Sequence, residues 1–531
     1  MTLSDQFPPR QPYNAVEDFV DANVARGAGA RTAFVDPERA LSYGELQQAT
    51  CRLASAMQRL GLRQESRVAL LLVDTVEFPI VFWGAIRAGI VAVPLNTLLT
   101  STQYAQVLND SRAEVLFVSP ALIRMIEPVI EKLTWLRSAV IVGADGGTPA
   151  KLGTLTAYRL EDLLSGSEPQ IWTAPTVADE VAFWLYSSGS TGDPKGTKHI
   201  HASLMATARR YGLGVLGIRD DDVVFSAAKL FFAYGLGNSM SFPMAVGAAA
   251  VLRPERLTPD LVFDVMRRYR PTIFYGVPTL YAALLAHGGI GHGVGSDRLR
   301  CCISAGEALP AHIGRRWREI VGLDILDGIG STEMLHIFLS NRVGDVRYGT
   351  SGKPVPGYEA RILGEDGREL GPAEIGELVV RGPSSAEGYW NQRSKSQRTF
   401  VGEWTYTGDK YVRDADGYYQ YCGRTDDMFK VSGYWVSPFE LEAALVSHEA
   451  IQEAAVIGRA AEDGLIKPKA FIVLKNGYAA SEDLFEALRA HVKERAGLRR
   501  YPHWFEVRAE LPKTATGKIQ RFRLREEDGT A

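Results

Sequence analysis

The chain of 531 residues is long enough for several domains with large hydrophobic cores. Its hydrophobic content of 46% and charged content of 23% are typical of globular proteins and exclude a largely disordered chain. Lysine plus arginine (59) nearly balance aspartate plus glutamate (62), for a formal net charge of −3, which argues against a nucleic-acid binder that relies on a basic face.

Cysteine content and apolar runs indicate the compartment. The chain has 4 cysteines, without metal-ligand spacing, which is few for an oxidised secreted scaffold, so we expect a cytoplasmic protein. Residues 1–14 lack the basic start and apolar core of a signal peptide. The most apolar region, 68–95, is interrupted by Asp74, Glu77 and Arg87, which a transmembrane helix would rarely tolerate. We therefore expect no membrane partner.

The first third of the chain alternates strands and helices. Hydrophobic periodicity predicts helices over 15–30 and 42–60, the second with a capping box at Ser42 and Glu45. Further helices are predicted over 77–88 and 120–133, and buried strands over 67–72, 90–94, 113–118 and 139–142. This alternation favours a parallel sheet.

A small-residue stretch follows the next buried strand, 181–186. It reads Tyr186-Ser187-Ser188-Gly189-Ser190-Thr191-Gly192-Asp193-Pro194-Lys195-Gly196, and 204–210 then has a helical pattern. A loop between strand and helix lets backbone N–H groups and hydroxyls approach an anion, and Lys195 adds a point charge suited to phosphate. The spacing is not that of a Walker A loop. The stretch predicts a polyphosphate site. The alternative, a flexible linker, is disfavoured by the Pro-Lys-Gly ending directly after a buried strand.

The pattern of predicted strands and helices changes twice in the second half of the chain. Strands are predicted over 223–227, 272–275 and 300–304, each after a helical pattern. From about 345, short strands over 360–363, 377–381 and 418–421 are separated by turns, which predicts a β-rich subdomain. After 423–427 the pattern is α+β, with helices over 438–446 and 483–495 and strands over 454–457 and 470–474. We therefore predict two domains, 1–425 and 426–531, with the boundary near Asp426.

Six motifs in this order resemble the acyl-adenylating superfamily of acyl- and aryl-CoA synthetases, luciferases and peptide-synthetase adenylation domains. They are 186–196, Ser304-Ala305-Gly306-Glu307, Gly328-Ile329-Gly330-Ser331-Thr332-Glu333, Tyr406-Thr407-Gly408-Asp409, Gly423-Arg424-Thr425-Asp426-Asp427 and 512–518. Within the superfamily, residues 231–238 and 330–338 resemble benzoate–CoA ligases and their hydroxybenzoate relatives. The implied fold is a large N-terminal domain of two parallel-sheet α/β subdomains plus a β-rich subdomain, and a small mobile α+β C-terminal domain.

The resemblance implies a reaction in two halves. A carboxylate attacks the α-phosphate of ATP to give acyl-AMP and pyrophosphate, and the thiol of coenzyme A then displaces AMP. Lys518 would neutralise the charge that develops in the first half; the alternative is a solvated surface lysine. Glu333 would hold Mg²⁺ and Thr332 would bond a phosphate, although Ser331 and Glu333 also suit the N-cap of a helix.

The resemblance also assigns a nucleotide site. Backbone and side chains that line it are Ser304, Ala305, Gly306, Glu307, Asp327, Gly328 and Ile329. Asp409 would accept both ribose hydroxyls, and Arg424 would add a donor to ribose or phosphate. Taken alone, each suits a turn residue or a surface ion pair.

Movement of the C-terminal domain is implied by analogy with the family. Asp426 matches the hinge position, about which the domain would swing between the two half-reactions. In the second pose Lys430 and Gly433 would line the thiol tunnel. The alternative is that 426–427 is a polar linker.

The acyl pocket follows from the same alignment. Its walls would be Ala233, Tyr234, Tyr275, Gly276, Gly330, Leu335, His336 and Ile337. These flat, apolar or small residues suit a planar ring. His336 would donate to the carboxylate or a ring substituent, or else be structural. No acidic residue lies within 231–237, where relatives that activate amino acids carry an aspartate, so the expected partner is a small aromatic carboxylate.

Two further functions stay open. An adenylating enzyme could load the thiol of a carrier protein instead of free coenzyme A. A catalytically silent nucleotide-binding protein on the same fold is disfavoured by the joint presence of Lys195, Glu333, Asp409 and Lys518. The expected oligomeric state is a monomer or homodimer.

Overall fold

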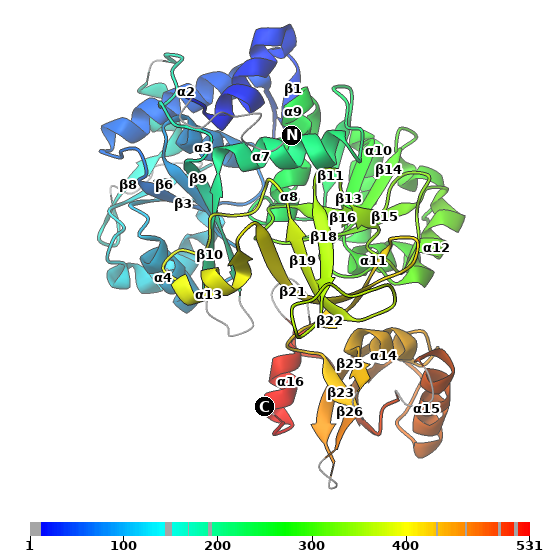
Figure 1. Ribbon diagram of the computed structural model, residues 1–531. Coiled ribbons are helices and arrows are strands. Elements are labelled where there is room, and N and C mark those ends of the chain that lie inside the picture. The colour runs from blue at the N-terminus through cyan, green and yellow to red at the C-terminus, as the bar shows by residue number, and fades with distance from the viewer. Residues whose placement is uncertain are drawn as a thin grey trace. The chain divides into compact units, whose positions relative to one another are not determined.

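The computed structural model describes residues 12–143, 151–167, 169–188, 194–431, 434–461, 465–496, 501–513 and 519–530. The chain divides into two compact units (Figure 1), Met1–Glu359 with Val380–Thr405, and Ala360–Val379 with Tyr406–Ala531. The predicted domain boundary near Asp426 stays a prediction.

One large sheet of the first unit has eight described strands. In spatial order they are β10 (Pro194–Ile200), β9 (Val181–Ser188), β4 (Val91–Pro94), β3 (Arg67–Leu71), β5 (Val115–Val118), β6 (Ser138–Ile141), β8 (Leu155–Arg159) and β7 (Lys151–Leu152). The strands from β9 to β8 are parallel, and β10 and β7 add antiparallel edges.

The helices that accompany this sheet agree with the apolar periodicity except in one segment. They are α2 (Tyr43–Arg59), α3 (Glu77–Arg87), α4 (Ser101–Ser111) and α6 (Leu160–Ser165), after two N-terminal π-helical turns, η1 (Glu17–Asp21) and η2 (Val24–Ala28). The capping box predicted at Ser42 and Glu45 is present. The helix predicted over 120–133 is broken into η3 (Pro120–Leu122), α5 (Ile123–Ile126) and η4 (Glu127–Lys132). Pro128, near the start of η4, lacks the N–H that a continuous helix needs there.

The other large sheet has nine described strands. In spatial order they are β17 (Lys353–Pro354), β16 (Ile337–Ser340), β15 (Ile325–Gly330), β14 (Cys301–Ser304), β13 (Ile273–Gly276), β11 (Val223–Ser226), β12 (Ala249–Val251), β1 (Thr32–Val35) and β2 (Ala40–Ser42). The strands from β15 to β1 are parallel, and the outer pairs are antiparallel. Both large sheets are therefore mixed, with the predicted parallel strands at their centres.

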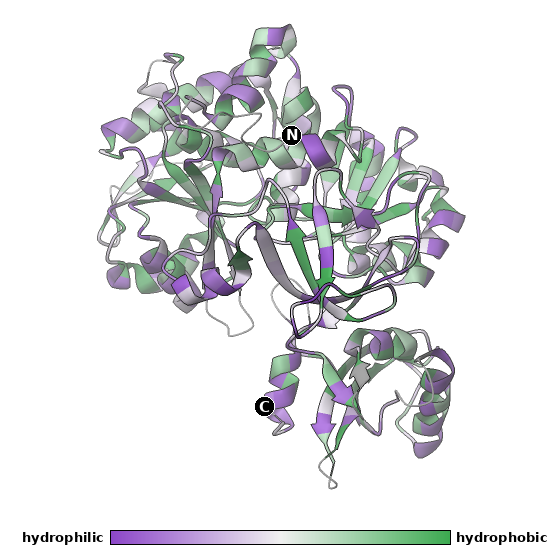
Figure 2. Cartoon of the chain, in the orientation of Figure 1, coloured by the Kyte–Doolittle hydropathy of each residue, from purple (hydrophilic) through white to green (hydrophobic). Residues whose placement is uncertain are grey.

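Helices again separate the parallel strands of this sheet. They are α7 (His201–Thr207) with η5 (Ala208–Leu213), α8 (Ala233–Leu236), η6 (Gly237–Ser241), α9 (Phe242–Val246), α10 (Pro259–Tyr269), α11 (Pro278–Ala286), η7 (His292–Gly295) and α12 (Ala311–Val321). A core of apolar side chains from α10, α11, α12 and the neighbouring strands packs on the sheet. Figure 2 shows the hydrophobic colour concentrated in the central strands of the large sheets.

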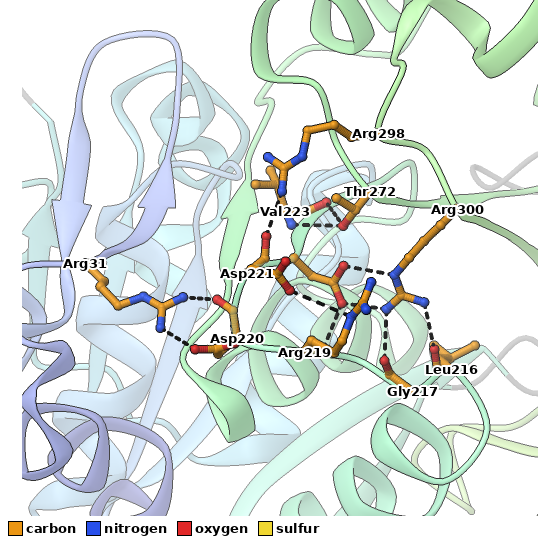
Figure 3. A network of polar contacts seen from close by, with 11 residues as sticks. Arg31, Leu216, Gly217, Arg219, Asp220, Asp221, Val223, Thr272, Arg298 and Arg300 are labelled. Atoms are coloured by element: carbon orange, nitrogen blue, oxygen red, sulfur yellow. Dashed lines mark hydrogen bonds and ion pairs between the residues drawn. The ribbon is translucent and has the colours of Figure 1, made fainter.

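A buried ion pair fixes the entry to two of these strands (Figure 3). Asp222, just before β11, has a side chain that is 1% exposed, and its carboxylate accepts bonds of 3.0 and 2.5 Å from the guanidinium of Arg300, just before β14. The same guanidinium donates to the carbonyl oxygens of Leu216 and Gly217 at 3.2 and 2.9 Å. The Arg300 guanidinium therefore links the loop after η5 to the parallel strands of the sheet.

A smaller sheet contains strands at which the chain passes from one unit to the other. Its order is β18 (Glu359–Leu363), β19 (Gly376–Arg381), β21 (Trp404–Arg413) and β20 (Phe400–Val401), with β22 (Tyr419–Arg424) paired to β21. The short helix α13 (Arg393–Thr399) precedes β20 and is hydrophilic (Figure 2). The β-rich segment predicted from about 345 is thereby confirmed.

The C-terminal part of the chain is α+β, as predicted. A hairpin of β23 (Phe429–Val431) and β24 (Tyr434–Val436) precedes a sheet of β25 (Ile451–Ala460), β26 (Ile466–Leu474) and β27 (Trp504–Val507). The helices are α14 (Pro438–Val446), α15 (Glu482–Ala496) and α16 (Arg521–Glu527). Side chains of α14, α15 and the sheet form its core. Across the described parts of the whole chain, every helix is too short or too polar to span a bilayer.

The predicted order of strand, loop and helix around 186–196 is wrong in one respect. Residues 194–200 form β10, which runs back along β9, and α7 begins only at His201. The Pro-Lys-Gly segment therefore forms a strand antiparallel to β9 instead of leading directly into a helix.

Candidate active site

The hairpin of β9 and β10 places the predicted phosphate-binding lysine. Lys195 lies opposite Ser187 and Gly196 lies opposite Tyr186 in the antiparallel register. The Tyr186 hydroxyl donates to Asp110 Oδ2 at 2.6 Å, which anchors the base of the hairpin. Residues 189–193, with the predicted Gly189, Ser190 and Thr191, and the side chain of Ser188 lie outside the described residues.

Lys195 belongs to a cluster of charged and aromatic groups. Its Nζ lies 3.6 Å from Glu333 Oε1, and the two side chains are 19% and 16% exposed. Tyr389 joins both, because its hydroxyl donates to Glu333 Oε1 at 2.7 Å and lies 3.4 Å from Lys195 Nζ. The ammonium also sits 4.7 Å from the centre of the Tyr389 ring, within the range of a cation–π contact. We call Lys195, Glu333 and Tyr389 the ionic cluster.

A turn between β15 and β16 presents Glu333 and Thr332. His199 of β10 contacts the Thr332 carbonyl oxygen through Nε2 at 2.9 Å, and burial lowers the pKa of His199 to about 4. The Ala386 N–H donates to the Glu333 carbonyl oxygen at 2.9 Å. Residues 331–336 form turns and bends, so the alternative that Ser331 caps a helix here is wrong. The turn is held from both sides, which fixes the backbone at Thr332 and Glu333.

The proposed adenine side lies where β13 and β14 end and where the parallel pairing of β14 with β15 ends. Gly276, Ser304 and Asp327 are neighbours in register across β13, β14 and β15. The carboxyl ends of parallel strands are where open α/β sheets bind ligands. Ser304 is 0% and Asp327 5% exposed, whereas Glu307 is exposed. The backbone of Gly306 has a φ of 94°, in the left-handed region that favours glycine.

Asp327 sits in a strongly desolvated position. Burial raises the pKa of its carboxyl well above the usual range, against the lowering effect of the Leu309 N–H, which donates to Oδ2 at 3.4 Å. Gly328 and Ile329 follow it on β15, paired with Ser340 and Leu339 of β16. Burial therefore favours the neutral form of this carboxyl group.

His336 lies at the centre of an aromatic cluster. Its ring is 4.5 Å from the Phe242 ring, 5.4 Å from Tyr211 and 5.6 Å from Tyr234, between ring centres. The Cα of Gly237 is so close that a Cβ there would lie 2.3 Å from His336 Cδ2. We call His336 with these aromatic neighbours the ring pocket.

The hydrogen bonds of His336 determine which ring nitrogen carries the proton. Nε2 is 3.1 Å from Asn238 Oδ1 and 3.3 Å from the Tyr234 carbonyl oxygen, both acceptors, so the assignment of the proton to Nε2 satisfies both. Asn238 Nδ2 donates to Ser226 Oγ at 3.1 Å, which orients its amide. Nδ1 is buried and lacks a partner among the described residues. Burial lowers the pKa of His336 to about 3, so the imidazole is neutral near pH 7.

The remaining predicted wall residues gather around this histidine. The Tyr234 and Tyr275 rings meet edge to face at 6.2 Å and 86°, and the Tyr234 hydroxyl is 3.3 Å from the Gly276 carbonyl oxygen. A Cβ on Gly330 would lie 2.6 Å from the His336 carbonyl carbon. Ala233 (8% exposed), Leu335 (2%) and Ile337 (1%) are adjacent in the chain to Tyr234 or His336. The structure therefore brings together the predicted wall residues.

The second unit carries the predicted ribose-binding pair. Asp409 of β21 lies opposite Arg424 of β22, and the guanidinium donates to Asp409 Oδ1 at 2.9 Å. Interaction with Asp409 raises the pKa of Arg424 above its usual range. Gly408 has a φ of 70°, and its N-terminal neighbour Thr407 accepts the Asp409 N–H through Oγ1 at 3.1 Å. Thr407, Gly408 and Asp409 all lie within β21, so the alternative that Asp409 is a turn residue is wrong.

The hinge and tunnel positions lie farther along the second unit. Asp426 is exposed, and Asp427 pairs with Arg521 at 3.4 Å and Arg525 at 2.9 Å. Lys430 Nζ is 2.9 Å from Glu365 Oε1. Gly433 and Lys518 lie outside the described residues.

Sequence reasoning missed Tyr389 and the Gly237–Asn238 pair as site residues. Tyr389 lies far along the chain from Lys195 and Glu333. It and its neighbours Gly388 and Trp390 lie outside the six motifs that resemble the acyl-adenylating superfamily. Gly237 and Asn238 fall inside the segment 231–238 that was singled out, but nothing in their residue types shows which side chain they contact.

The arrangement combines two kinds of chemistry. The ionic cluster offers an ammonium for phosphate oxygens and a carboxylate for a cation. The ring pocket offers neutral, flat surfaces. Such a pair can hold a polyphosphate and an aromatic ring in one site.

Comparison with known protein families covers most of the chain. Residues 20–390 match the sequence model of the AMP-binding enzyme, and residues 440–518 match that of the AMP-binding enzyme C-terminal domain. The 4-hydroxybenzoate–CoA/benzoate–CoA ligase of Rhodopseudomonas palustris is 54% identical over 98% of this chain and 95% of its own length. The benzoate–CoA ligase of Thauera aromatica is also 54% identical, over 97% and 96%.

Solved structures agree with these matches. A benzoate CoA ligase from Burkholderia xenovorans LB400 superposes with a TM-score of 0.87 at 46% identity, over 97% of this chain and 100% of that one. The anthranilate CoA ligase AuaEII, solved with anthranoyl-AMP, has a TM-score of 0.90 at 42% identity, over 99% of each chain. The chain therefore belongs to the AMP-binding enzyme family.

Proposed function

We propose that this protein is an AMP-forming aryl-CoA ligase. It activates benzoate or a small substituted benzoate with ATP to aryl-AMP and pyrophosphate, and then transfers the aryl group to coenzyme A with release of AMP. The observation that carries this proposal is the 54% identity to two benzoate-activating CoA ligases along nearly the full chain. The ring pocket supports it, because a neutral, aromatic wall suits a flat, uncharged ring.

Magnesium is part of the proposal, and the donor set around Glu333 fits it. Mg²⁺ is commonly bound by one or two carboxylates together with phosphate oxygens and water. Within the described ranges there is no cluster of three or more His, Cys, Asp or Glu side chains, which fits an ion shared with the polyphosphate. Glu333 would hold it, and Mg²⁺ would neutralise charge on the phosphate oxygens.

The adenylation half uses residues of this chain in separate roles. Lys195 and the stretch Ser187–Thr191 would hold the polyphosphate, and Thr332 would donate to a phosphate oxygen. Ser304–Glu307 and Asp327–Ile329 would surround the adenine, and Asp409 and Arg424 would bind the ribose. Lys518 would stabilise the charge that develops as the carboxylate oxygen attacks the α-phosphate. Proximity of two bound anions is unfavourable without such cations, which is why the proposal needs them.

The ring itself would lie among Ala233, Tyr234, Tyr275, Gly276, Gly330, Leu335, His336 and Ile337. Because the Nε2–H of His336 already has two acceptors, its Nδ1 would accept a hydrogen bond from a donor. A ring hydroxyl offers such a donor, whereas a carboxylate does not.

The transfer half would follow a domain rotation. We place the boundary near Asp426, with domains 1–425 and 426–531, and Asp426 as the hinge. After rotation, Lys430 and Gly433 would line the path of the thiol. A carrier-protein thiol is the second candidate acceptor. We expect a monomer or homodimer in the cytoplasm.

The first test measures pyrophosphate release with ATP and Mg²⁺, with and without coenzyme A. The acids are benzoate, hydroxy-, amino-, methyl- and halobenzoates, cyclohexanecarboxylate, a fatty acid and several amino acids. Continuous release with benzoates only when coenzyme A is present is the expected result. Release that stops after a single turnover despite coenzyme A would favour the carrier-protein acceptor, and no release with any acid would contradict the proposal.

Substitution Lys518→Ala separates the half-reactions. Loss of the cation should lower aryl-AMP formation roughly 100-fold or more, because it acts where charge develops. Transfer from supplied aryl-AMP to coenzyme A should change little. Lys513→Ala is the matched control, since Lys513 pairs with Glu453 at 2.6 Å and has no proposed role in the reaction. Equal loss in both half-reactions would contradict the role of Lys518.

A further inference from the structure

Tyr389 is held rigidly by the same hairpin that carries Lys195. The Trp390 N–H donates to the Gly196 carbonyl oxygen at 2.8 Å, and the Lys198 N–H donates to the Gly388 carbonyl oxygen at 3.0 Å. These bonds add the 388–390 segment to the outer edge of β10. The backbone on both sides of Tyr389 is therefore tied to the hairpin.

The Tyr389 side chain is equally restricted. It is 5% exposed, and its ring packs on Phe400 at 5.4 Å and 59°. The Ser396 hydroxyl accepts the Tyr389 N–H at 3.0 Å. A buried phenol ring fixed at its backbone and along one edge has few alternative rotamers.

The hydroxyl end of the Tyr389 side chain lies beside Glu333 and Lys195, two residues with proposed roles in adenylation. The hydroxyl donates to Glu333 Oε1 at 2.7 Å, and the ring lies 4.7 Å from Lys195 Nζ. Lys195 and Glu333 also pair with each other, at 3.6 Å. Because bound ATP would draw the ammonium toward its phosphates, Glu333 would then depend more on Tyr389 for its orientation.

We propose that Tyr389 is a positioning residue for adenylation: its hydroxyl orients the Glu333 carboxylate, and its ring holds the Lys195 ammonium beside the phosphate-binding hairpin. This inference rests on the proposed function for its role in turnover. Tyr389 itself supplies no charge. Its contribution is the geometry of the carboxylate and the ammonium.

Two variants separate the hydroxyl from the ring. Tyr389→Phe removes the bond to Glu333 and the longer contact of 3.4 Å with Lys195 Nζ, and it keeps the ring beside Lys195. Tyr389→Leu removes both. Hydrogen bonds to a charged group are strong enough that Tyr389→Phe should weaken binding of Mg²⁺-ATP roughly 10-fold. Tyr104→Phe is the matched control, because the Tyr104 hydroxyl of α4 is also buried and donates to a carbonyl oxygen, that of Asn96 at 2.8 Å, away from the cluster.

Calorimetry of ATP binding is the readout that does not depend on turnover. For Tyr389→Phe we expect a raised dissociation constant with Mg²⁺ present and a much smaller change in EDTA, where Glu333 holds no ion and the ring still supports Lys195. For Tyr389→Leu both constants should rise. Tyr104→Phe should match the wild type in both conditions.

Kinetics provides the second readout. Tyr389→Phe should require a higher Mg²⁺ concentration for half-maximal pyrophosphate release, while transfer from supplied aryl-AMP to coenzyme A stays at the wild-type rate. Wild-type affinity for Mg²⁺-ATP in Tyr389→Phe, or equal loss in both half-reactions, would overturn the inference. If the wild type released no pyrophosphate with any acid, the proposed function would fail, and the calorimetric arms would still decide the role of Tyr389.

Discussion

The ionic cluster and the ring pocket lie in the same unit and treat buried polar groups in opposite ways. In the ionic cluster, Lys195 and Glu333 keep partial exposure, at 19% and 16%, and pair with each other. In the ring pocket, His336 is 3% exposed, and burial lowers its pKa to about 3, so that it is neutral. Charged side chains thus lie where the proposed ligand would bring charge, and a neutral imidazole lies where it would bring an apolar ring.

The cost of desolvation explains this division. A charged group deep in a protein needs a close partner, and an unpaired one shifts its pKa until it is neutral. Asp327, inside β15, is of the second kind, since burial raises the pKa of its carboxyl well above the usual range. Glu333, only a few residues later in the chain, instead has two close partners, Lys195 and Tyr389.

The largest expected effect comes from a substitution in the ionic cluster. Glu333→Gln keeps the size of the side chain and removes its charge. We expect pyrophosphate release with benzoate to fall roughly 100-fold or more, because a metal-binding carboxylate contributes several kcal/mol to such reactions. The dissociation constant of benzoate, measured without ATP, should stay near the wild-type value. A comparable loss of benzoate affinity would show that the two regions do not act separately.

The next largest effect comes from a substitution in the ring pocket. Gly237→Ala would place a Cβ 2.3 Å from His336 Cδ2 and 3.0 Å from Phe242 Cζ, so His336 must shift. Overpacking of this kind costs about 1–3 kcal/mol, which should raise the KM for benzoate roughly 10-fold or more and leave the KM for ATP unchanged. Gly288→Ala is the control, because a Cβ at Gly288 meets no atom within 4 Å. An unchanged KM for benzoate would contradict the position assigned to the ring.

The smallest effect tests whether buried histidines are neutral. His201 is 1% exposed, its Nδ1 accepts the Ala15 N–H at 3.1 Å, and burial lowers its pKa to about 3. The unfolded state, with a histidine pKa near 6.5, binds a proton below that pH and the folded state does not, so stability falls as pH falls. Between pH 7 and pH 6 the loss is about 0.7 kcal/mol for one such histidine.

The variant His201→Asn isolates this contribution. Its amide oxygen can replace Nδ1 as the acceptor, and it does not titrate. Denaturant unfolding at pH 7 and pH 6 should therefore show a smaller loss of stability in the variant than in the wild type. Asp74, whose burial raises its pKa to about 6, opposes the trend in both proteins and cancels in the difference. An identical pH dependence in wild type and variant would mean that His201 binds a proton as readily in the folded as in the unfolded state, and would contradict the lowered pKa.

Sequence patterns predicted local features well and spatial partners poorly. The capping box at Ser42 and the strands β3 and β13 follow from short-range periodicity, and they are present. The edge strand β10 was missed because Pro194 and Gly196 are typical of loops, whereas the pairing with β9 is decided by tertiary contacts. Local preference also misled at 120–133, where apolar spacing suggested one helix although Pro128 interrupts it.

The site shows the same limit. Lys195, Glu333 and His336 were predicted because they sit in recognisable motifs. Tyr389 was missed because its role depends on a contact with residues far away in the chain. Likewise the proton position on His336 depends on Asn238 and Ser226, which no spacing rule connects.

The most direct test of the account follows oxygen atoms. Benzoate labelled with 18O in both carboxylate positions is incubated with the enzyme, ATP, Mg²⁺ and coenzyme A, and the products are examined by mass spectrometry. If the carboxylate attacks the α-phosphate and the thiol then displaces AMP, the AMP formed carries one 18O atom and the pyrophosphate carries none. Label in inorganic phosphate or pyrophosphate, or unlabelled AMP formed together with benzoyl-CoA, would contradict the adenylation mechanism proposed for this protein.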